Sequence, residues 1–163
     1  MRKRLRRLRR LGALLVAAGS LVIISGLLMP LARDTWGQAY NGFAGPRYHS
    51  LELNRVAGMY GVGMVFVAVS LLACAMGVLL PSLSGSGKWA SYFALLGFLI
   101  SFFWYMAASD REGFGRMDVG FAVVVAGEAC AFAGAVLCGH CSRRLERLDR
   151  WKLIADARRA RKT

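Results

Sequence analysis

Four long apolar runs dominate this chain, and each is about as long as a lipid bilayer is thick. They are Leu11–Leu31, Val56–Leu80, Trp89–Ser109 and Val119–Cys138. A hydrocarbon core of roughly 30 Å needs about 20 apolar residues in a helix that rises about 1.5 Å per residue. We therefore expect an all-α integral membrane protein: a single domain over residues 1–163 that forms a four-transmembrane-helix bundle.

Basic residues gather at the two ends of the chain. Of the 22 lysines and arginines, seven precede Leu11 and nine follow Cys138. An excess of Lys and Arg beside the cytoplasmic ends of spans is typical of membrane proteins. We therefore expect a multi-pass protein of the bacterial inner (plasma) membrane, with both termini in the cytoplasm. The net charge of +13 then indicates contact with anionic lipids at both basic tails, and no nucleic-acid partner.

The N-terminal sequence imitates a signal peptide, because arginines precede an apolar run. Leu11–Leu31 is longer than the usual core of a signal peptide. A cleavage site ending at Ala32 is poor, since Pro30 lies two residues before it. We expect Leu11–Leu31 to be an uncleaved signal anchor.

The expected outer loop, residues 32–55, combines aromatic and basic side chains. Two interpretations are open: aromatic rings that rest at the level of the lipid headgroups, or a cap that faces a partner. Aromatic and arginine side chains are enriched at binding hot spots. The candidate partner-contact residues of the loop are Trp36, Tyr40, Arg47, Tyr48 and His49.

Small residues recur every four positions along Val119–Cys138, in two neighbouring rows. Such rows let a second helix approach closely. We expect this helix at the centre of the bundle or at an oligomer contact, with Gly127 and Gly134 as candidate partner contacts.

The tail of residues 139–163, expected in the cytoplasm, predicts a basic amphipathic helix. Apolar residues share one face of it and arginines occupy the rest; the apolar ones are Leu145, Leu148, Trp151, Leu153 and Ile154. This helix either lies on the inner leaflet or continues the fourth span into the cytoplasm.

Glu128 is the one charged residue within the four apolar runs. A carboxylate at that depth is costly unless it is protonated, paired or in a wet cavity. Two interpretations are open: a proton or cation relay used in transport, or a neutral glutamate hydrogen-bonded across the bundle. The candidate hydrogen-bond donors are Ser20, Ser25, Ser70 and Tyr60.

A CxxC motif runs from Cys138 to Cys141, but its context opposes redox chemistry. The motif needs a helix N-terminus to activate its thiol, whereas here it ends an apolar helix on a side expected to be reducing. Cys138, His140 and Cys141 are weak metal candidates, because the chain offers no clear fourth ligand. We expect no cofactor.

Motifs for catalysis are lacking: there is no HExxH, no glycine-rich phosphate loop and no nucleophile–base pair. We therefore expect a non-enzymatic accessory, assembly or scaffold subunit that packs against partner membrane subunits or against itself. One alternative is a small oligomeric transporter or channel that uses Glu128. A second alternative is a quinone- or thiol-linked membrane redox subunit, since Trp89–Ser109 is rich in aromatic residues.

Overall fold

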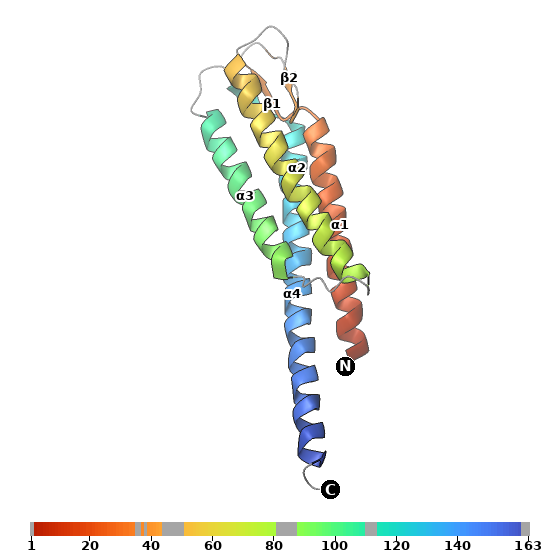
Figure 1. Cartoon of the computed structure of the whole chain (residues 1–163). Helices are drawn as coiled ribbons and strands as arrows, with labels where there is room; N and C mark the ends of the chain where they lie inside the picture. The colour runs from red at the N-terminus through yellow and green to blue at the C-terminus, as the bar shows by residue number, and fades with distance from the viewer. Residues whose placement is uncertain are drawn as a thin grey trace.

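The computed structural model describes residues 2–34, 37, 39–43, 51–80, 88–109 and 114–160. Within them the helices are α1 (Arg2–Leu28), α2 (Leu51–Leu79), α3 (Lys88–Ser109) and α4 (Val119–Ala160) (Figure 1). Each of the four is long and apolar enough to cross a membrane. The four predicted apolar helices are therefore confirmed, and the architecture is typical of a multi-pass membrane protein.

The four helices pack side by side as a ring. Among the described residues, the main helix–helix interfaces join α1 to α4, α1 to α2, α2 to α3 and α3 to α4, and the α1–α4 interface is the largest. Helices that follow one another along the chain are neighbours, as is usual in up-and-down bundles. α4 is therefore one wall of the ring and does not form a central axis.

α1 and α4 approach each other through glycines that recur every seven residues on both helices. The antiparallel pairs are Gly12 with Gly134, Gly19 with Gly127, and Gly26 with Gly120. A Cβ atom built on Gly19 would lie 2.6 Å from the Gly127 carbonyl oxygen, which is closer than a side chain can approach. Glycine therefore allows the two backbones to touch, and a strict seven-residue repeat favours a left-handed supercoil.

Both α1 and α4 extend beyond the apolar runs. α1 begins at Arg2, and α4 continues unbroken for 42 residues. At about 1.5 Å per residue α4 is about 63 Å long, twice the thickness of a bilayer core. Arginine is a good helix former, so the basic sequence does not end either helix. The basic amphipathic C-terminal segment therefore continues α4, as one of the two expected arrangements had it, and projects beyond the other helices (Figure 1).

Three short strands join the loops at one end of the bundle, and no pattern in the sequence predicts them. They are β1 (Ala32–Asp34), β2 (Ala39–Tyr40) and β3 (Phe114–Met117), in the antiparallel order β2-β1-β3. Once α1 has ended, the backbone needs new hydrogen-bond partners. The Leu31 N–H donates to the Tyr40 carbonyl at 2.7 Å, and the Asp118 N–H donates to the Leu31 carbonyl at 2.9 Å. The fold is therefore not purely helical.

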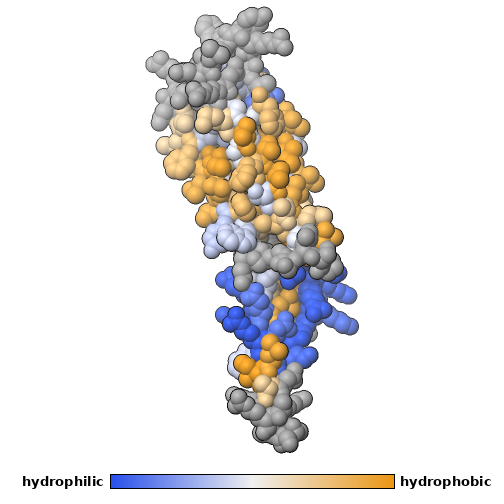
Figure 2. Space-filling view, viewed as in Figure 1, coloured by the Kyte–Doolittle hydropathy of each residue, from blue (hydrophilic) through white to orange (hydrophobic). Residues whose placement is uncertain are grey.

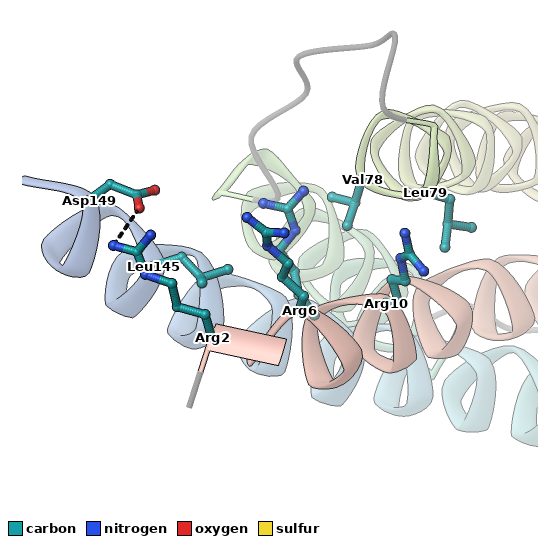
Figure 3. A pocket seen from close by; sticks show the side chains of 8 residues that line it. Arg2, Arg6, Arg10, Val78, Leu79, Leu145 and Asp149 are labelled. Carbon is teal, nitrogen blue, oxygen red and sulfur yellow. Dashed lines mark ion pairs between the residues drawn. The ribbon is translucent and has the colours of Figure 1, made fainter. Parts of the chain in front are cut away.

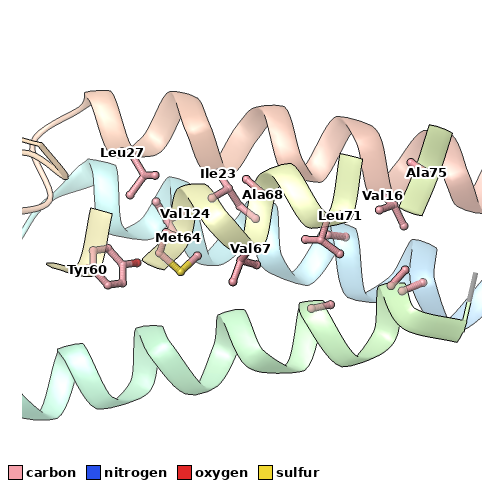
Figure 4. Close-up of a cluster of buried hydrophobic side chains, with 14 of the residues drawn as sticks. Val16, Ile23, Leu27, Tyr60, Met64, Val67, Ala68, Leu71, Ala75 and Val124 are labelled. Carbon is pink, nitrogen blue, oxygen red and sulfur yellow. The ribbon is translucent and has the colours of Figure 1, made fainter. Parts of the chain in front are cut away.

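The core lies between the helices, while apolar side chains also cover the outside. The side chains labelled in Figure 4 come from α1, α2 and α4 and include Val16, Ile23, Leu27, Met64, Val67, Leu71 and Val124. α3 adds Ala90, Ala94 and Trp104 to the same core. Large apolar side chains are exposed on the four helices, among them Leu21, Phe66, Phe102 and Val136. The face of the molecule shown in Figure 2 has an apolar band with a hydrophilic section below it. An apolar exterior of this extent suits lipid better than water.

Candidate functional site

The Glu128 carboxyl group is buried near the middle of the apolar part of the bundle. Glu128 lies about 14 Å along α4 from Val119, close to half the thickness of a bilayer core. The residue is only 1% exposed. α3 makes room for it through Gly97, because a Cβ atom built on that glycine would lie 3.2 Å from Glu128 Oε1.

One carboxyl oxygen belongs to a chain of hydrogen bonds that crosses three helices. Ser101 Oγ of α3 donates to Glu128 Oε1 at 2.7 Å, and the Tyr60 hydroxyl of α2 lies 3.0 Å from Ser101 Oγ. Since a serine hydroxyl has one proton, the Tyr60 hydroxyl donates to Ser101 when Ser101 donates to Glu128. The Tyr60 ring stacks on Trp104, with centroids 4.6 Å apart, and this contact fixes the phenol.

The other carboxyl oxygen, Oε2, is buried without a hydrogen-bond partner among the described residues. In the ionised carboxylate Oε2 needs a donor, and in the acid a protonated Oε2 needs an acceptor. Neither ion pair found within the described residues, Arg2–Asp149 or Arg33–Asp118, involves Glu128. A buried polar atom that is unsatisfied in this way is uncommon in native proteins.

A groove of about 200 Å³ between α3 and α4 leads to this carboxyl group. It is lined by Phe98, Ser101, Phe102, Tyr105, Phe121, Val125 and Glu128. Phe102 is 57% exposed and Tyr105 is 45% exposed, whereas Ser101 and Glu128 are buried. The groove therefore opens on the apolar outer surface and ends at the polar pair inside the bundle.

The hydrogen-bond donor of Glu128 differs from the donors predicted. Ser20 and Ser25 each donate to a carbonyl of their own helix, at 2.8 Å, and Tyr60 reaches Glu128 only through Ser101. Ser70, half-buried on α2, is not among the hydrogen-bond partners of Glu128. A signal for Ser101 was present, because Gly97 and Ser101 are two small residues four positions apart, near the middle of the span Trp89–Ser109.

Gly127 and Gly134, the predicted partner-contact glycines, are covered by α1 of the same chain. A Cβ atom would lie 2.8 Å from the Gly19 carbonyl oxygen at Gly127, and 2.6 Å from the Gly12 carbonyl oxygen at Gly134. The small residues do bring a second helix close, but that helix is α1. Neither glycine lies on an outer surface.

Of the predicted contact residues in the outer loop, only Tyr40 lies within the described residues. It is 0% exposed, so its ring belongs to the interior near the end of the bundle and is not available to a partner. Trp36, Arg47, Tyr48 and His49 lie outside the described residues.

The CxxC cysteines are buried free thiols. The Cys138 thiol donates to the Arg9 carbonyl of α1 at 3.1 Å, while His140 is exposed. Within the part of the chain that the structure describes, no three His, Cys, Asp or Glu side chains gather as a metal site. Cys138, His140 and Cys141 therefore do not form a common ligand set, and the Cys138 thiol lies in the contact between α1 and α4.

Glu128 and Ser101 thus line the groove, while Gly97 makes room for the carboxyl group and Tyr60 extends the hydrogen-bond chain. Comparison of the chain with protein-family models, curated proteins and solved structures finds no match.

Proposed function

We propose that this chain is a small, non-enzymatic membrane transporter that takes a lipophilic ammonium ion from the bilayer at Glu128. The supporting observation is Glu128, which lines an apolar groove and whose Oε2 atom is buried without a hydrogen-bond partner among the described residues. An ammonium N–H supplies both the donor and the positive charge that a carboxylate oxygen needs in this surrounding.

The lining of the groove favours an organic cation. Phe98, Phe102 and Phe121 contribute aromatic faces, which attract ammonium groups and also bury hydrocarbon. A metal ion such as Mg²⁺ or Ca²⁺ requires about six or more oxygen ligands, and the side chains of the groove offer one carboxyl group and the hydroxyl groups of Ser101 and Tyr105. The preferred ligand is therefore a cation with an apolar body.

Exchange of a proton for the cation follows from the burial of the carboxyl group. Without a cation the carboxyl holds its proton, because an isolated charge at this depth is costly. When an ammonium ion enters, the carboxylate pairs with it and the proton leaves. Ser101 and Tyr60 meanwhile hold Oε1, so Oε2 is the oxygen left to pair with the cation.

The test is transport by the full-length chain in proteoliposomes, with 4-phenylbutylammonium as the probe because its N–H groups can donate to Glu128 Oε2, and with protein-free liposomes as the measure of background permeation. We expect proton-coupled uptake by the wild type and a loss of about tenfold or more in Glu128→Gln, because the amide cannot exchange a proton for a cation. Glu146→Gln is the matched control, since it makes the same change on the exposed extension of α4. Equal uptake by Glu128→Gln and the wild type would refute the proposal.

We propose an accessory or scaffold subunit as the second candidate function. It is supported by the α4 extension, which exposes Trp151, Leu153 and Ile154 beyond the end of α1. The variant Trp151→Ser/Leu153→Ser/Ile154→Ser should no longer bind a partner that docks on this surface. Arg144→Gln with Arg147→Gln, on the same extension, is the control and should retain the partner in the same fixed ratio, measured by native mass spectrometry. Equal retention by both variants would contradict a docking role for the extension.

We propose the bacterial inner membrane as the location, with both termini in the cytoplasm. The basic ends of α1 and α4 lie together, since Arg2 forms an ion pair with Asp149 at 3.2 Å. Figure 2 shows the hydrophilic section at one end of the apolar band. When basic residues gather on one side of the membrane spans, that side is usually the cytoplasmic one.

A further inference from the structure

A basic cavity lies where the apolar band of the bundle gives way to the hydrophilic extension. It has a volume of about 300 Å³, and its walls come from the first turns of α1, the last turn of α2 and the extension of α4 (Figure 3). Arg2, Arg6, Arg9 and Arg10 all line it. At 100° per residue these four positions share one face of α1, so their side chains point into the same space.

The positive charge of this cavity is only partly neutralised. Asp149 is the single acidic residue among its lining residues, and it pairs with Arg2, which also donates to the Leu148 carbonyl at 3.1 Å. Neither ion pair among the described residues includes Arg6, Arg9 or Arg10. Planar guanidinium groups clustered in this way suit the oxygens of a phosphate group.

The rest of the lining is apolar and continues onto the lipid-facing surface. Val78 and Leu79 at the end of α2 face the arginines across the cavity, as Figure 3 shows. Leu80, next along the chain, is 41% exposed. A soluble inorganic anion would make no favourable contact with this apolar wall. A phospholipid would place its glycerol and acyl chains against the wall while its phosphate group contacts the arginines.

We propose that this cavity binds the headgroup of one anionic phospholipid from the leaflet at this end of the bundle. Its volume is at the lower limit of ligand pockets, which suits a headgroup whose acyl chains remain in the bilayer. A net negative headgroup is preferred over a zwitterionic one, because four arginines face one aspartate. This site is separate from the Glu128 groove, and its failure would leave the transport proposal untouched.

The test compares two double variants of α1 in the full-length protein. Arg6→Gln with Arg10→Gln removes two cavity arginines. Arg4→Gln with Arg7→Gln removes the same charge from the same helix, but both of these arginines are exposed and neither lines the cavity. Delipidated protein is titrated with phosphatidylglycerol or phosphatidylcholine, and native mass spectrometry measures bound lipid.

We expect the wild type and Arg4→Gln/Arg7→Gln to retain one phosphatidylglycerol in preference to phosphatidylcholine. Arg6→Gln/Arg10→Gln should bind phosphatidylglycerol about tenfold or more weakly, because two charge-assisted contacts are lost. Equal phosphatidylglycerol binding by the two double variants would overturn the proposal. Competition by millimolar inorganic phosphate as effective as that by the lipid would also overturn it, since the site would then recognise a free anion.

A second variant covers the case in which the charge change disturbs folding. Leu145→Trp fills the cavity from the α4 side and leaves all four arginines in place. Thermal unfolding in phosphatidylcholine alone shows whether each variant is folded. A folded Leu145→Trp protein should lose the stabilisation that phosphatidylglycerol gives the wild type, and retention of the full stabilisation would contradict a cavity site.

Discussion

The two oxygens of the Glu128 carboxyl group have different surroundings, and this difference is the basis of the proposed function. Oε1 accepts from Ser101, while Oε2 has no partner among the described residues. Gly97 provides the space for the carboxyl group, and Tyr60 fixes the serine. The carboxyl group therefore has one oxygen that is hydrogen-bonded across the bundle and a second, also buried, that has no partner among the described residues.

At the residue scale, Ser101→Ala should weaken transport without abolishing it. Removal of the hydroxyl leaves Oε1 and the Tyr60 hydroxyl without a shared partner, at a cost of about 1 kcal/mol of stability, but leaves the charge exchange at Oε2 possible. The measurement is thermal unfolding combined with uptake of the probe cation. Ser20→Ala is the control, because that buried hydroxyl donates only within its own helix and its loss should leave both readouts near wild type. Equal behaviour of the two variants would contradict the proposed hydrogen-bond chain.

The burial of Glu128 could be predicted from the sequence, but the surroundings of its carboxyl group could not. A single charge in four apolar runs indicates a buried carboxyl group whatever the arrangement of the helices. The donor depends on which helix lies opposite and at which depth, and a sequence pattern does not contain that register. Ser101 was missed for this reason, although its spacing from Gly97 marked a face of close approach.

At the scale of elements, the α1–α4 pair is the best-defined contact of the bundle. Its glycines make the two backbones meet at three levels along the helices. The seven-residue spacing of the glycines is present in both runs, whereas the predicted small-residue rows of α4 have a four-residue spacing. The helix ends were underestimated, because arginine does not stop a helix in the way that proline does. The strands contain two to four residues, too few to show a periodic pattern.

Gly127→Ala should destabilise the bundle, by about 1–3 kcal/mol, because the new Cβ atom would meet the backbone of α1 at Gly19 and Ile23. Gly139→Ala is the matched change on the same helix, and nothing lies within 4 Å of its Cβ position. The control should be neutral or slightly stabilising, since alanine favours a helix over glycine. Unfolding in detergent measures both variants, and equal stability of the two would contradict the close α1–α4 packing.

At the scale of the whole molecule, the ring of helices places the basic ends of α1 and α4 beside each other. The order of the helices around the ring could not be read from the sequence, because all four runs have apolar faces on every side. The sequence left two arrangements open for the basic segment, residues 139–163: a helix on the inner leaflet, or a continuation of the fourth span. The structure has the second, as part of α4. This helix carries charge and exposed apolar side chains well beyond the apolar band (Figure 2).

Cysteine labelling tests this arrangement in a variant without the native cysteines. Cysteines placed at Lys3 and Lys152, which are both exposed, should react with a membrane-impermeant thiol reagent from the same side. We expect that side to be the cytoplasm, because basic flanks are retained there. Labelling of the two positions from opposite sides would contradict the four-span bundle.

The most direct test of the central claim is difference infrared spectroscopy of the protein in lipid nanodiscs during addition of 4-phenylbutylammonium. We expect the band of a protonated carboxylic acid to disappear and a carboxylate band to appear as the cation binds. Neither change should occur in Glu128→Gln, or in the wild type when the neutral analogue 4-phenylbutanol is added. If the cation leaves the wild-type carboxyl bands unchanged, or changes them equally in Glu128→Gln, then Glu128 does not exchange its proton for a lipophilic cation.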